Sequence, residues 1–387
     1  MPPKSAAIVG AGVGGLVAAL SLAQNGVECD IVEQAPQLGE VGAGLQLSPN
    51  ATWVLGQLGV LAEIEKHWRE PDFVRLSSGL NLRSIAALPA GAAARTRWGA
   101  PYGVLHRSTL QQCLLSAVLR HPLCHLHLGT RIENADRRAL SEIAGRSISL
   151  VVGADGVWSR TRAGVAAAPK VSFSGNVAWR FTLNAAAAPD FLDGANVTAF
   201  LGPRTHLVTY PLREINGFNV VAIAAGVDPG ETWAASGSEA QRAALVAQFS
   251  AWNPAIRSLL SGAAELKFWP LFEAGPGRWQ NGGDTALVGD AAHAMMPFAA
   301  QGAAMAIEDG FELAALVARL PLPLALGHYE RRRQQRAARV RKRGNFNRFA
   351  YHATGPARIA RDLVLAMRSP ASLAGDLDWL YGFRAGQ

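Results

Sequence analysis

The sequence has 387 residues, of which 49% are hydrophobic, and a formal net charge of +8. This length and composition suggest a globular chain of about two domains with a large buried core. We expect a cytoplasmic protein without a membrane segment, because no signal peptide precedes the first strand-like run and no uninterrupted apolar run approaches the roughly 18 residues of a membrane span.

The first element is a strand at residues 6–9, followed by a glycine turn, an apolar helix that ends near Gly26 and a second strand that ends at Glu33. The apolar periodicity changes from strand to helix and back to strand within this segment. That order predicts a βαβ unit.

The turn of this unit contains the motif G-x-G-x-x-G at Gly10, Gly12 and Gly15. Gly10 permits a tight turn, Gly12 lets the backbone approach a diphosphate, and Gly15 allows close helix packing. Glu33 then ends the second strand, where an acidic side chain can accept hydrogen bonds from an adenosine ribose. The motif predicts dinucleotide binding but does not by itself distinguish NAD from FAD.

Strand-like runs at 148–152 and 286–289, and an alanine-rich helix from about Gly302, predict further parallel strands of the same sheet. Residues 171–270 instead alternate short apolar runs with Gly, Pro and Asn turns, which favours an antiparallel sheet. We therefore predict an α/β fold with an α+β second domain and C-terminal helices. The predicted ranges are 1–70, 100–170 and 271–327 for a discontinuous Rossmann-like dinucleotide-binding domain, 71–99 and 171–270 for an antiparallel-sheet substrate domain, and 328–387 for the C-terminal helical segment.

The positive charge is concentrated in residues 331–343, RRRQQRAARVRKR, which carry eight basic residues and no acidic one. The run predicts a solvated helix face, and a nucleic-acid or membrane surface is the alternative. It contains no aromatic residue to stack on bases, so we expect neither a nucleic-acid nor a membrane partner.

Three long motifs together resemble the signatures of class A flavoprotein aromatic monooxygenases. They are the glycine motif, VVGADGVWSRTR (151–162) and ALVGDAAHAMMPFAAQGAAMAIEDG (286–310). The segments GAGLQLSPNA (42–51), LHRSTL (105–110), AWR (178–180), HLVTYP (206–211) and DWLYGF (378–383) extend the resemblance over essentially the full chain, to the branch of salicylate hydroxylase and 3-hydroxybenzoate 6-hydroxylase. The resemblance implies that FAD is the dinucleotide.

The resemblance also implies roles for individual residues at the cofactor. Asp290 accepts a hydrogen bond from the ribityl chain, Arg107 contacts the phosphate or ribityl region, and the helix end at Gly302 faces the pyrimidine edge of the flavin. Asp155 either organises the region between FAD and nicotinamide or only caps its own turn. The predicted cofactor-binding residues are Gly10, Gly12, Gly14, Gly15, Glu33, Gln34, Arg107, Asp155, Asp290, Gly302 and Ala303.

Metal binding is not expected. Asp290 and His293 could be read as ligands, but no further ligand set lies near them, and the three cysteines form no C-x-x-C pair. The chain departs from the resembled pattern at Thr109, Ala294 and Ala304, which affects turn rigidity and hydrogen bonding near the flavin.

In HLVTYP, side chains alternate between the faces of a strand, so His206 and Tyr210 share one face. Ring hydroxylation is easier when a phenol loses its proton, and histidine is a suitable base near neutral pH. The resemblance makes His206 and Tyr210 the catalytic, substrate-lining pair, and adds Gln46 and Pro297 as substrate contacts. The alternatives are a buried, hydrogen-bonded pair in the sheet and, for Gln46, packing of its loop on the flavin.

The implied function is hydroxylation of a small aromatic (hydroxybenzoate, salicylate or hydroxynicotinate type) by O2 through a flavin C4a-hydroperoxide. Because the chain has one dinucleotide fingerprint and the resemblance assigns it to FAD, NADH or NADPH is expected to bind transiently as electron donor. The resemblance also implies a homodimer as an expected assembly. Two rival hypotheses remain. One is another FAD-dependent oxidase or reductase on the same fold, and the other is a polyanion-binding protein that uses the arginine-rich helix.

Overall fold

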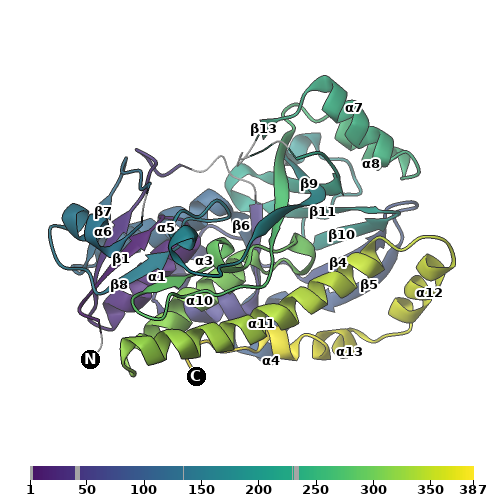
Figure 1. The fold of residues 1–387 in the computed structure, drawn as a ribbon. Helices are drawn as coiled ribbons and strands as arrows, with labels where there is room; N and C mark the ends of the chain where they lie inside the picture. The colour runs from purple at the N-terminus through teal and green to yellow at the C-terminus, as the bar shows by residue number, and fades with distance from the viewer. Residues whose placement is uncertain (1–2, 40–43, 134, 229, 231–234) are drawn as a thin grey trace.

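The computed structural model describes residues 3–39, 44–133, 135–228, 230 and 235–387, and it contains two large sheets with a long helix beneath them (Figure 1). The first two residues of the segment at 42–51 lie outside the described part. No described helix combines the length and the apolar character needed to cross a membrane.

The first sheet is parallel and has five strands, as the βαβ pattern predicts. Its central strand pairs Ile8 with Ile31 on one side and with Val152 on the other, and all three side chains are buried. Across the sheet, the strands are β15 (Thr285–Leu287), β8 (Leu150–Gly153), β1 (Ser5–Val9), β2 (Glu28–Val32) and β7 (Cys124–His127). The observed ends of these strands differ from the ends predicted from the sequence by one or two residues.

Helices α1 and α10 pack closely against each other beside this sheet. A Cβ on Gly310 would lie only 2.8 Å from the backbone of Ala18, so this close contact requires a glycine. The helices before the arginine-rich run are α1 (Val13–Gln24), α2 (Pro49–Gln57), α3 (Leu61–Glu65), α4 (Gly91–Trp98), α5 (Arg107–Arg120), α6 (Arg137–Ala144), α7 (Glu239–Gln248), α8 (Pro254–Ser261), α9 (Asp290–His293) and α10 (Gly302–Val317).

The second sheet has eight strands. All its neighbouring strands are antiparallel except β10 and β4, which are parallel. A parallel pair is allowed here because a long stretch of chain separates the two strands. Across the sheet, they are β13 (Ala235–Ser236), β14 (Lys267–Ala274), β9 (Val171–Asn184), β12 (Gly217–Ala225), β11 (Thr205–Leu212), β10 (Val197–Gly202), β4 (Phe73–Ser78) and β5 (Ser84–Pro89). A short antiparallel pair, β3 (Gly44–Leu47) with β6 (Gly103–His106), forms a third sheet.

The arginine-rich run lies within one helix of 30 residues, α11 (Leu322–Tyr351), which extends along the lower side of the molecule in Figure 1. It is followed by α12 (Gly355–Ala366), α13 (Pro370–Gly375) and α14 (Asp378–Tyr381). The predicted α/β fold with a second sheet and C-terminal helices is confirmed, while the domain boundaries remain a prediction.

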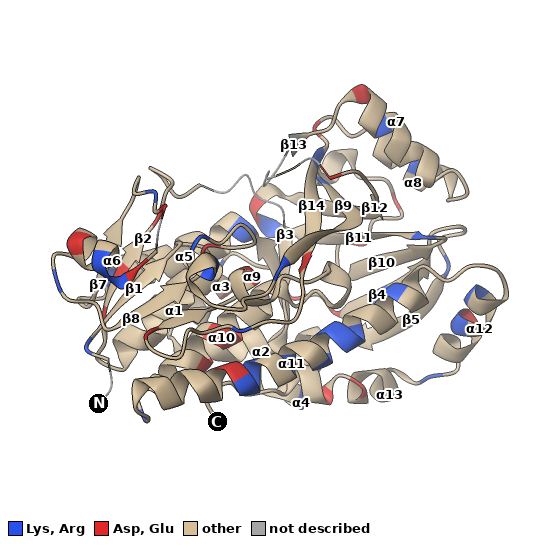
Figure 2. Ribbon diagram, viewed as in Figure 1, with Lys and Arg blue, Asp and Glu red and all other residues tan. Residues whose placement is uncertain are grey.

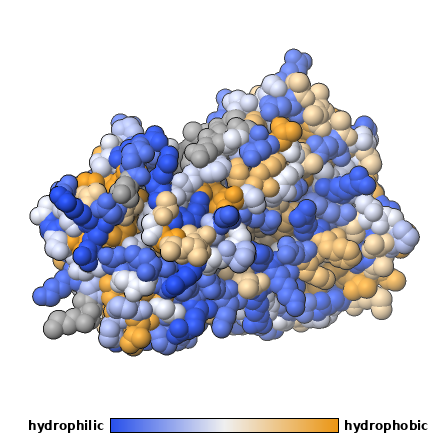
Figure 3. Space-filling model, viewed as in Figure 1, coloured by the Kyte–Doolittle hydropathy of each residue, from blue (hydrophilic) through white to orange (hydrophobic). Residues whose placement is uncertain are grey.

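Helix α12 exposes an apolar face, which contributes to the orange and tan area at the lower right of Figure 3. Ile359, Leu363 and Val364 are each about 60% exposed, and Met367 beyond them is 78% exposed. The expected homodimer remains a prediction.

Candidate active site and cofactor cradle

The glycine turn forms a cradle between β1 and α1. Gly10 has a φ of +102°, and a Cβ there would lie 2.6 Å from the carbonyl oxygen of Ala154, so only glycine fits. A Cβ on Gly12 would meet nothing within 4 Å, which leaves open space in front of the helix end. Because the first N–H groups of a helix lack intrahelical partners, this end can bind a diphosphate. Gly14 faces Ala306 of α10, and Gly15 is buried beside Gly10.

Glu33 follows β2 and supports the same turn. Its two carboxylate oxygens accept hydrogen bonds from the backbone N–H groups of Ala11 (2.8 Å) and Ala35 (2.9 Å). Each oxygen can accept a further hydrogen bond, so contact with a ribose remains a prediction. Gln34 is exposed directly beside it.

Asp155 caps the turn that follows β8. Its carboxylate accepts hydrogen bonds from the hydroxyl of Ser159 (2.6 Å), from the backbone N–H of Arg160 (2.7 Å), and from both the N–H and the hydroxyl of Thr161 (2.9 and 3.1 Å). These contacts match the capping alternative. Asp155 can therefore shape the loop without touching a ligand.

The remaining predicted cofactor residues begin helices. Asp290 is exposed at the first position of α9, and half-buried Arg107 begins α5. Gly302 and Ala303 begin α10 and are half-buried. The first N–H groups of this helix also lack intrahelical partners and can bind an electron-rich group.

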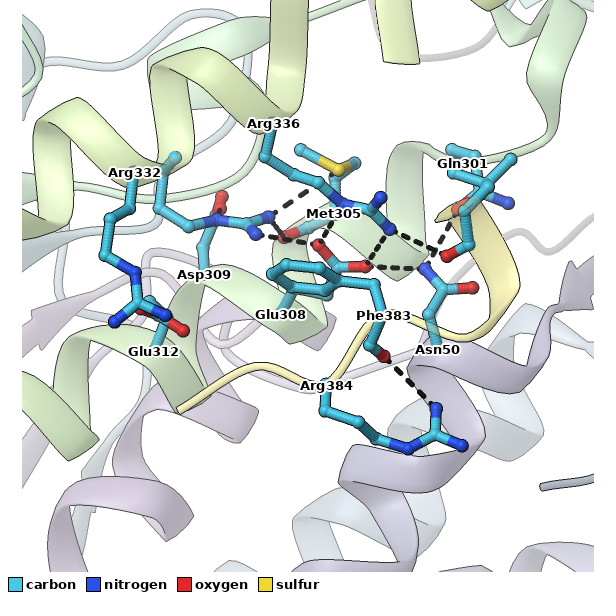
Figure 4. A network of polar contacts seen from close by, with 12 residues as sticks. Asn50, Gln301, Met305, Glu308, Asp309, Glu312, Arg332, Arg336, Phe383 and Arg384 are labelled. Atoms are coloured by element: carbon cyan, nitrogen blue, oxygen red, sulfur yellow. Dashed lines mark hydrogen bonds and ion pairs between the residues drawn. The ribbon is translucent and has the colours of Figure 1, made fainter. Parts of the chain in front are cut away.

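A buried polar network fixes the first turns of α10 (Figure 4). Gln301, which precedes the helix, donates to the hydroxyl of Ser48 (2.9 Å) and accepts from Asn50 (3.0 Å). Asn50 also donates to the carboxylate of Glu308 (2.6 Å), about two turns further along α10. The start of α2 is thus bonded to the helix end that is predicted to face the flavin.

Two arginines of the basic run complete the network from α11. Arg333 contacts Glu308 (2.7 Å) and Asp309 (2.6 Å), and Arg336 contacts Glu308 (2.8 Å). Arg333 is only 1% exposed and Arg336 7%, so the expectation of a fully solvated helix face is wrong for these two residues. The physical reason is that buried carboxylates on α10 neutralise them.

Asp309 also connects the network to the loop before Asp290. It accepts hydrogen bonds from the backbone N–H of Gly289 (2.8 Å) and from Nε2 of His293 (2.6 Å). Burial alone would raise the pKa of Asp309, but His293 and Arg333 outweigh it and lower that pKa to about 2. The carboxylate is therefore charged at neutral pH and holds α9, α10 and α11 together.

A cavity of about 160 Å³ lies between the second sheet, the loop after α9 and the C-terminal helices. An apolar cavity of about 150 Å³ can hold benzene, so this volume suits one aromatic ring. The sheet contributes alternate residues, as expected for one face of strands. The lining residues are Gln46, Val74, Leu76, Ala86, Leu88, Tyr102, Val197, Ala199, His206, Val208, Pro297, Phe298, Ala299, Ala300, Arg343, Asn347, Tyr351, Leu365, Leu373, Leu377, Leu380 and Tyr381.

His206 lines this cavity from β11 and is only 3% exposed. Its ring lies against those of Phe298 (5.0 Å between centroids) and Tyr351 (5.6 Å), and its Nδ1 lies 2.9 Å from Nε2 of His352. Burial, and then the neighbouring His352, hold the pKa of His206 well below its usual value. The imidazole is therefore neutral at neutral pH, with one unprotonated ring nitrogen that can accept a hydrogen bond.

Tyr210 shares the strand face of His206 but does not line the cavity. It is 2% exposed and lies beneath β3, where a Cβ on Gly44 would come within 2.6 Å of its ring. Gln46 and Pro297 do line the cavity. The hydroxyl of Tyr102, which sequence reasoning missed, donates to Oε1 of Gln46 (2.6 Å).

Arg343 is the only permanently charged residue among the described side chains that line the cavity. Its Nε is buried and has no hydrogen-bond partner among the described residues. Arg180, in the segment AWR, is not among the lining residues, and its guanidinium lies over the ring of Trp269 (5.3 Å). No sequence pattern distinguishes Arg343 from the other arginines of the run.

The cradle and the cavity together define a dinucleotide-binding protein with a second, ring-sized site. Comparisons with known proteins agree. A family described as "FAD binding domain" matches residues 4–343. The chain is 34% identical to 3-hydroxybenzoate 6-hydroxylase 1 of Aquipseudomonas alcaligenes, over 97% of this chain and 96% of the relative. It is 35% identical to 3-amino-4-hydroxybenzoate 2-monooxygenase of Streptomyces cremeus, over 98% and 95%.

The fold has a counterpart among solved structures. A variant of Klebsiella pneumoniae HpxO complexed with FAD superimposes with a TM-score of 0.82 at 21% identity, covering 98% of each chain. The chain belongs to the FAD-binding family of flavin-dependent aromatic monooxygenases. The open space at Gly12 and the free helix ends at α1 and α10 fit that cofactor.

Proposed function

We propose that this protein uses FAD, O2 and NADH or NADPH to hydroxylate a single aromatic ring that carries a phenolic hydroxyl and a carboxylate. The observation that carries the proposal is that one ring-sized cavity combines a buried neutral histidine, His206, with one permanent positive charge, Arg343. The two relatives described above hydroxylate a hydroxybenzoate and an aminohydroxybenzoate, which have both groups.

Arg343 is the proposed partner of the substrate carboxylate. A guanidinium with a buried, unpaired Nε gains a charge-assisted hydrogen bond when a carboxylate enters. The rest of the wall is mostly apolar, from the valines and leucines of the sheet to the leucines of α12 and α13, so such a pair would be weakly screened.

His206 is the proposed acceptor of the phenolic proton. Its Nδ1 is engaged with His352, which leaves Nε2 as the ring nitrogen available to the substrate. A proton taken up at Nε2 can be balanced by release from Nδ1 toward His352, which is only partly buried. Tyr102 and Gln46, which also line the cavity, are proposed to help orient the ring through their shared hydrogen bond.

The overall reaction balances when solvent supplies one proton in addition to O2 and NAD(P)H. One atom of O2 enters the ring as a hydroxyl group, the other leaves as water, and NAD(P)H supplies the two electrons. FAD, when bound, accepts those electrons and activates O2. The protein's part is to hold the ring in a cavity with few polar groups, so that water is excluded.

The test compares phenolic acids with their carboxamides on the FAD-loaded enzyme, with 3-hydroxybenzoate and 3-hydroxybenzamide as the first pair. The acid should be hydroxylated. Arg343→Met should raise KM for the acid about 10- to 100-fold, because a hydrogen bond to a charged group is lost, with little effect on the amide. Arg331→Met is the matched control, because Arg331 is exposed on the same helix and outside the cavity.

Equal KM values for acid and amide, or an Arg343→Met variant that behaves like Arg331→Met, would contradict the role of Arg343. NAD(P)H oxidation that yields only hydrogen peroxide with every phenol tested would instead favour the rival FAD-dependent oxidase or reductase.

A further inference from the structure

We propose that a hollow on the outer side of α11 is the docking site for the nicotinamide dinucleotide, and that it binds the diphosphate through Arg341 and Arg348. This inference rests on the proposed use of NADH or NADPH. The hollow has a volume of about 610 Å³. It lies where α11 passes the first residues of β9 and the last residues of β14. It is separate from the aromatic cavity, since the two share no lining residue.

The geometry of α11 presents the basic groups as a stripe. Arg341, Asn345 and Arg348 are spaced by four and three residues, so they lie on one face of the helix, and all three line the hollow. The residues of α11 that line the aromatic cavity, Arg343 and Asn347, belong to another face. Basic side chains recur along α11 in Figure 2.

The two arginines of the hollow differ from those of the buried network because they have no acidic partner. Arg341 and Arg348 make no ion pair with any described residue, and Nε of Arg341 is buried without a hydrogen-bond partner in the same part of the chain. By contrast, Arg333 and Arg336 are neutralised by Glu308. The unpaired guanidinium groups are therefore available for an anion, and guanidinium geometry suits phosphate oxygens.

The other lining groups match the rest of a dinucleotide. The Glu273 carboxylate is a hydrogen-bond acceptor only, which suits ribose hydroxyls. Phe349 is 71% exposed at the hollow, where its ring can stack on a base. A site for phosphate alone would need neither group, so the combination favours a nucleotide.

The hollow and the aromatic cavity lie on two sides of one loop. Ala274 in the hollow donates its backbone N–H to the carbonyl of Ala294 (2.9 Å), in the loop after α9. Three residues further on, Pro297 begins the part of that loop that lines the aromatic cavity, and Phe298 there is bonded to Asn347 of α11 (2.9 Å). The hollow is thus one hydrogen bond away from the loop that joins Asp290, a predicted cofactor residue, to the wall of the aromatic cavity.

The experiment uses the FAD-loaded enzyme and two readouts. Anaerobic stopped-flow reduction of the flavin by NADH and by NADPH gives the Kd of the donor, and calorimetric titration with ADP-ribose measures binding of the diphosphate part without any turnover. In an R341Q/R348Q variant we expect both Kd values to rise about 10- to 100-fold, since charged hydrogen bonds are lost. FAD content and the Kd of 3-hydroxybenzoate should not change.

Lys342→Gln is the matched control, because Lys342 is exposed next to Arg341 but does not line the hollow. Equal effects of the control and the double variant, or no effect of the double variant, would overturn the proposal. Arg348→Gln alone, at an exposed position, replaces the double variant if that protein does not fold. If dithionite reduces the wild-type flavin but neither nicotinamide does, the proposed function fails, and the ADP-ribose titration still decides whether the hollow binds a dinucleotide.

Discussion

At the scale of single residues, His206 shows how burial adapts an ordinary side chain to the proposed chemistry. A solvent-exposed histidine is partly protonated near its usual pKa, whereas His206 is kept neutral by its apolar surroundings. The hydrogen bond to His352 gives its ring a fixed orientation and a partner for the second nitrogen. Burial thus keeps the base unprotonated before the reaction and favours loss of the proton afterwards, while the contact with His352 orients the ring.

His206→Asn is expected to slow hydroxylation about 10²- to 10⁴-fold, the usual contribution of general base catalysis, with FAD content unchanged. His352→Gln keeps a hydrogen-bonding side chain but removes the second titratable ring. The kcat of the His352→Gln enzyme should therefore lie between the kcat of the wild type and that of His206→Asn. The rate of product formation at saturating NAD(P)H, measured for both variants, checks both predictions. A His206→Asn enzyme with wild-type coupled turnover would show that the residue only packs.

The same pair predicts a dependence of stability on pH. Burial and then Arg348 lower the pKa of His352 to about 4 from 6.5. Between those values the unfolded chain binds more protons than the folded chain, so stability is lost as pH falls from 6.5 toward 4. Each such group contributes at most about 1.4 kcal/mol per pH unit. Urea unfolding across this range should show a smaller loss for His352→Gln than for the wild type, and equal losses would contradict the assignment.

Strand alternation correctly predicts that His206 and Val208 share a face, and both line the cavity. It does not predict where along that face the cavity ends. Tyr210 lies one step further along β11, beneath Gly44, because β3 covers that part of the strand. Such a limit is set by a neighbouring element and cannot be read from the spacing of residues in one strand.

At the scale of elements, α11 holds α10 in place and also forms a wall of the aromatic cavity. Arg333 and Arg336 in its first half contact the carboxylates of α10. Arg341, Arg343 and Arg348 in its second half line the two proposed ligand sites. The local sequence predicts the helix but not this division, because the acidic partners at 308 and 309 lie on another helix.

Arg333→Met tests the contribution of this contact. Removing one member of a buried ion network leaves Glu308 and Asp309 without their main partner, so unfolding free energy should fall by about 3–5 kcal/mol. Denaturant unfolding measures this loss, and FAD affinity should weaken too, because the network positions the start of α10. Arg331→Met, at an exposed site of α11, should change stability by less than about 0.5 kcal/mol. Similar stability of the two variants would argue against the network.

The βαβ unit could be predicted in detail because its signals are local. Apolar periodicity marks β1, α1 and β2, and the glycine motif marks the turn between them. The parallel pairing of β10 with β4 had no such signal, since it joins segments more than a hundred residues apart. Local patterns therefore predicted whether each sheet is mainly parallel or antiparallel, but not the order of its strands.

At the scale of the whole molecule, the aromatic cavity is assembled from segments that are distant in sequence. The second sheet supplies one wall, the loop at Pro297 another, and the C-terminal helices close it with Leu365, Leu373 and Leu377. The family motifs predict the first two, because each contains a recognisable pattern. Helices α12 and α13 carry no such motif, so Leu365 and Leu373 emerge only from the packing, as does the role of Arg343 on α11.

The central claim is that a phenolic acid held in this cavity receives one oxygen atom from O2 at the expense of NAD(P)H. The most direct measurement is turnover of 3-hydroxybenzoate by the FAD-loaded enzyme under ¹⁸O2, with product mass and NAD(P)H consumption followed together. The account predicts one ¹⁸O atom in each product molecule and close to one product per NAD(P)H. Unlabelled product, or NAD(P)H consumption that yields peroxide without a hydroxylated product for this acid and its isomers, would contradict it.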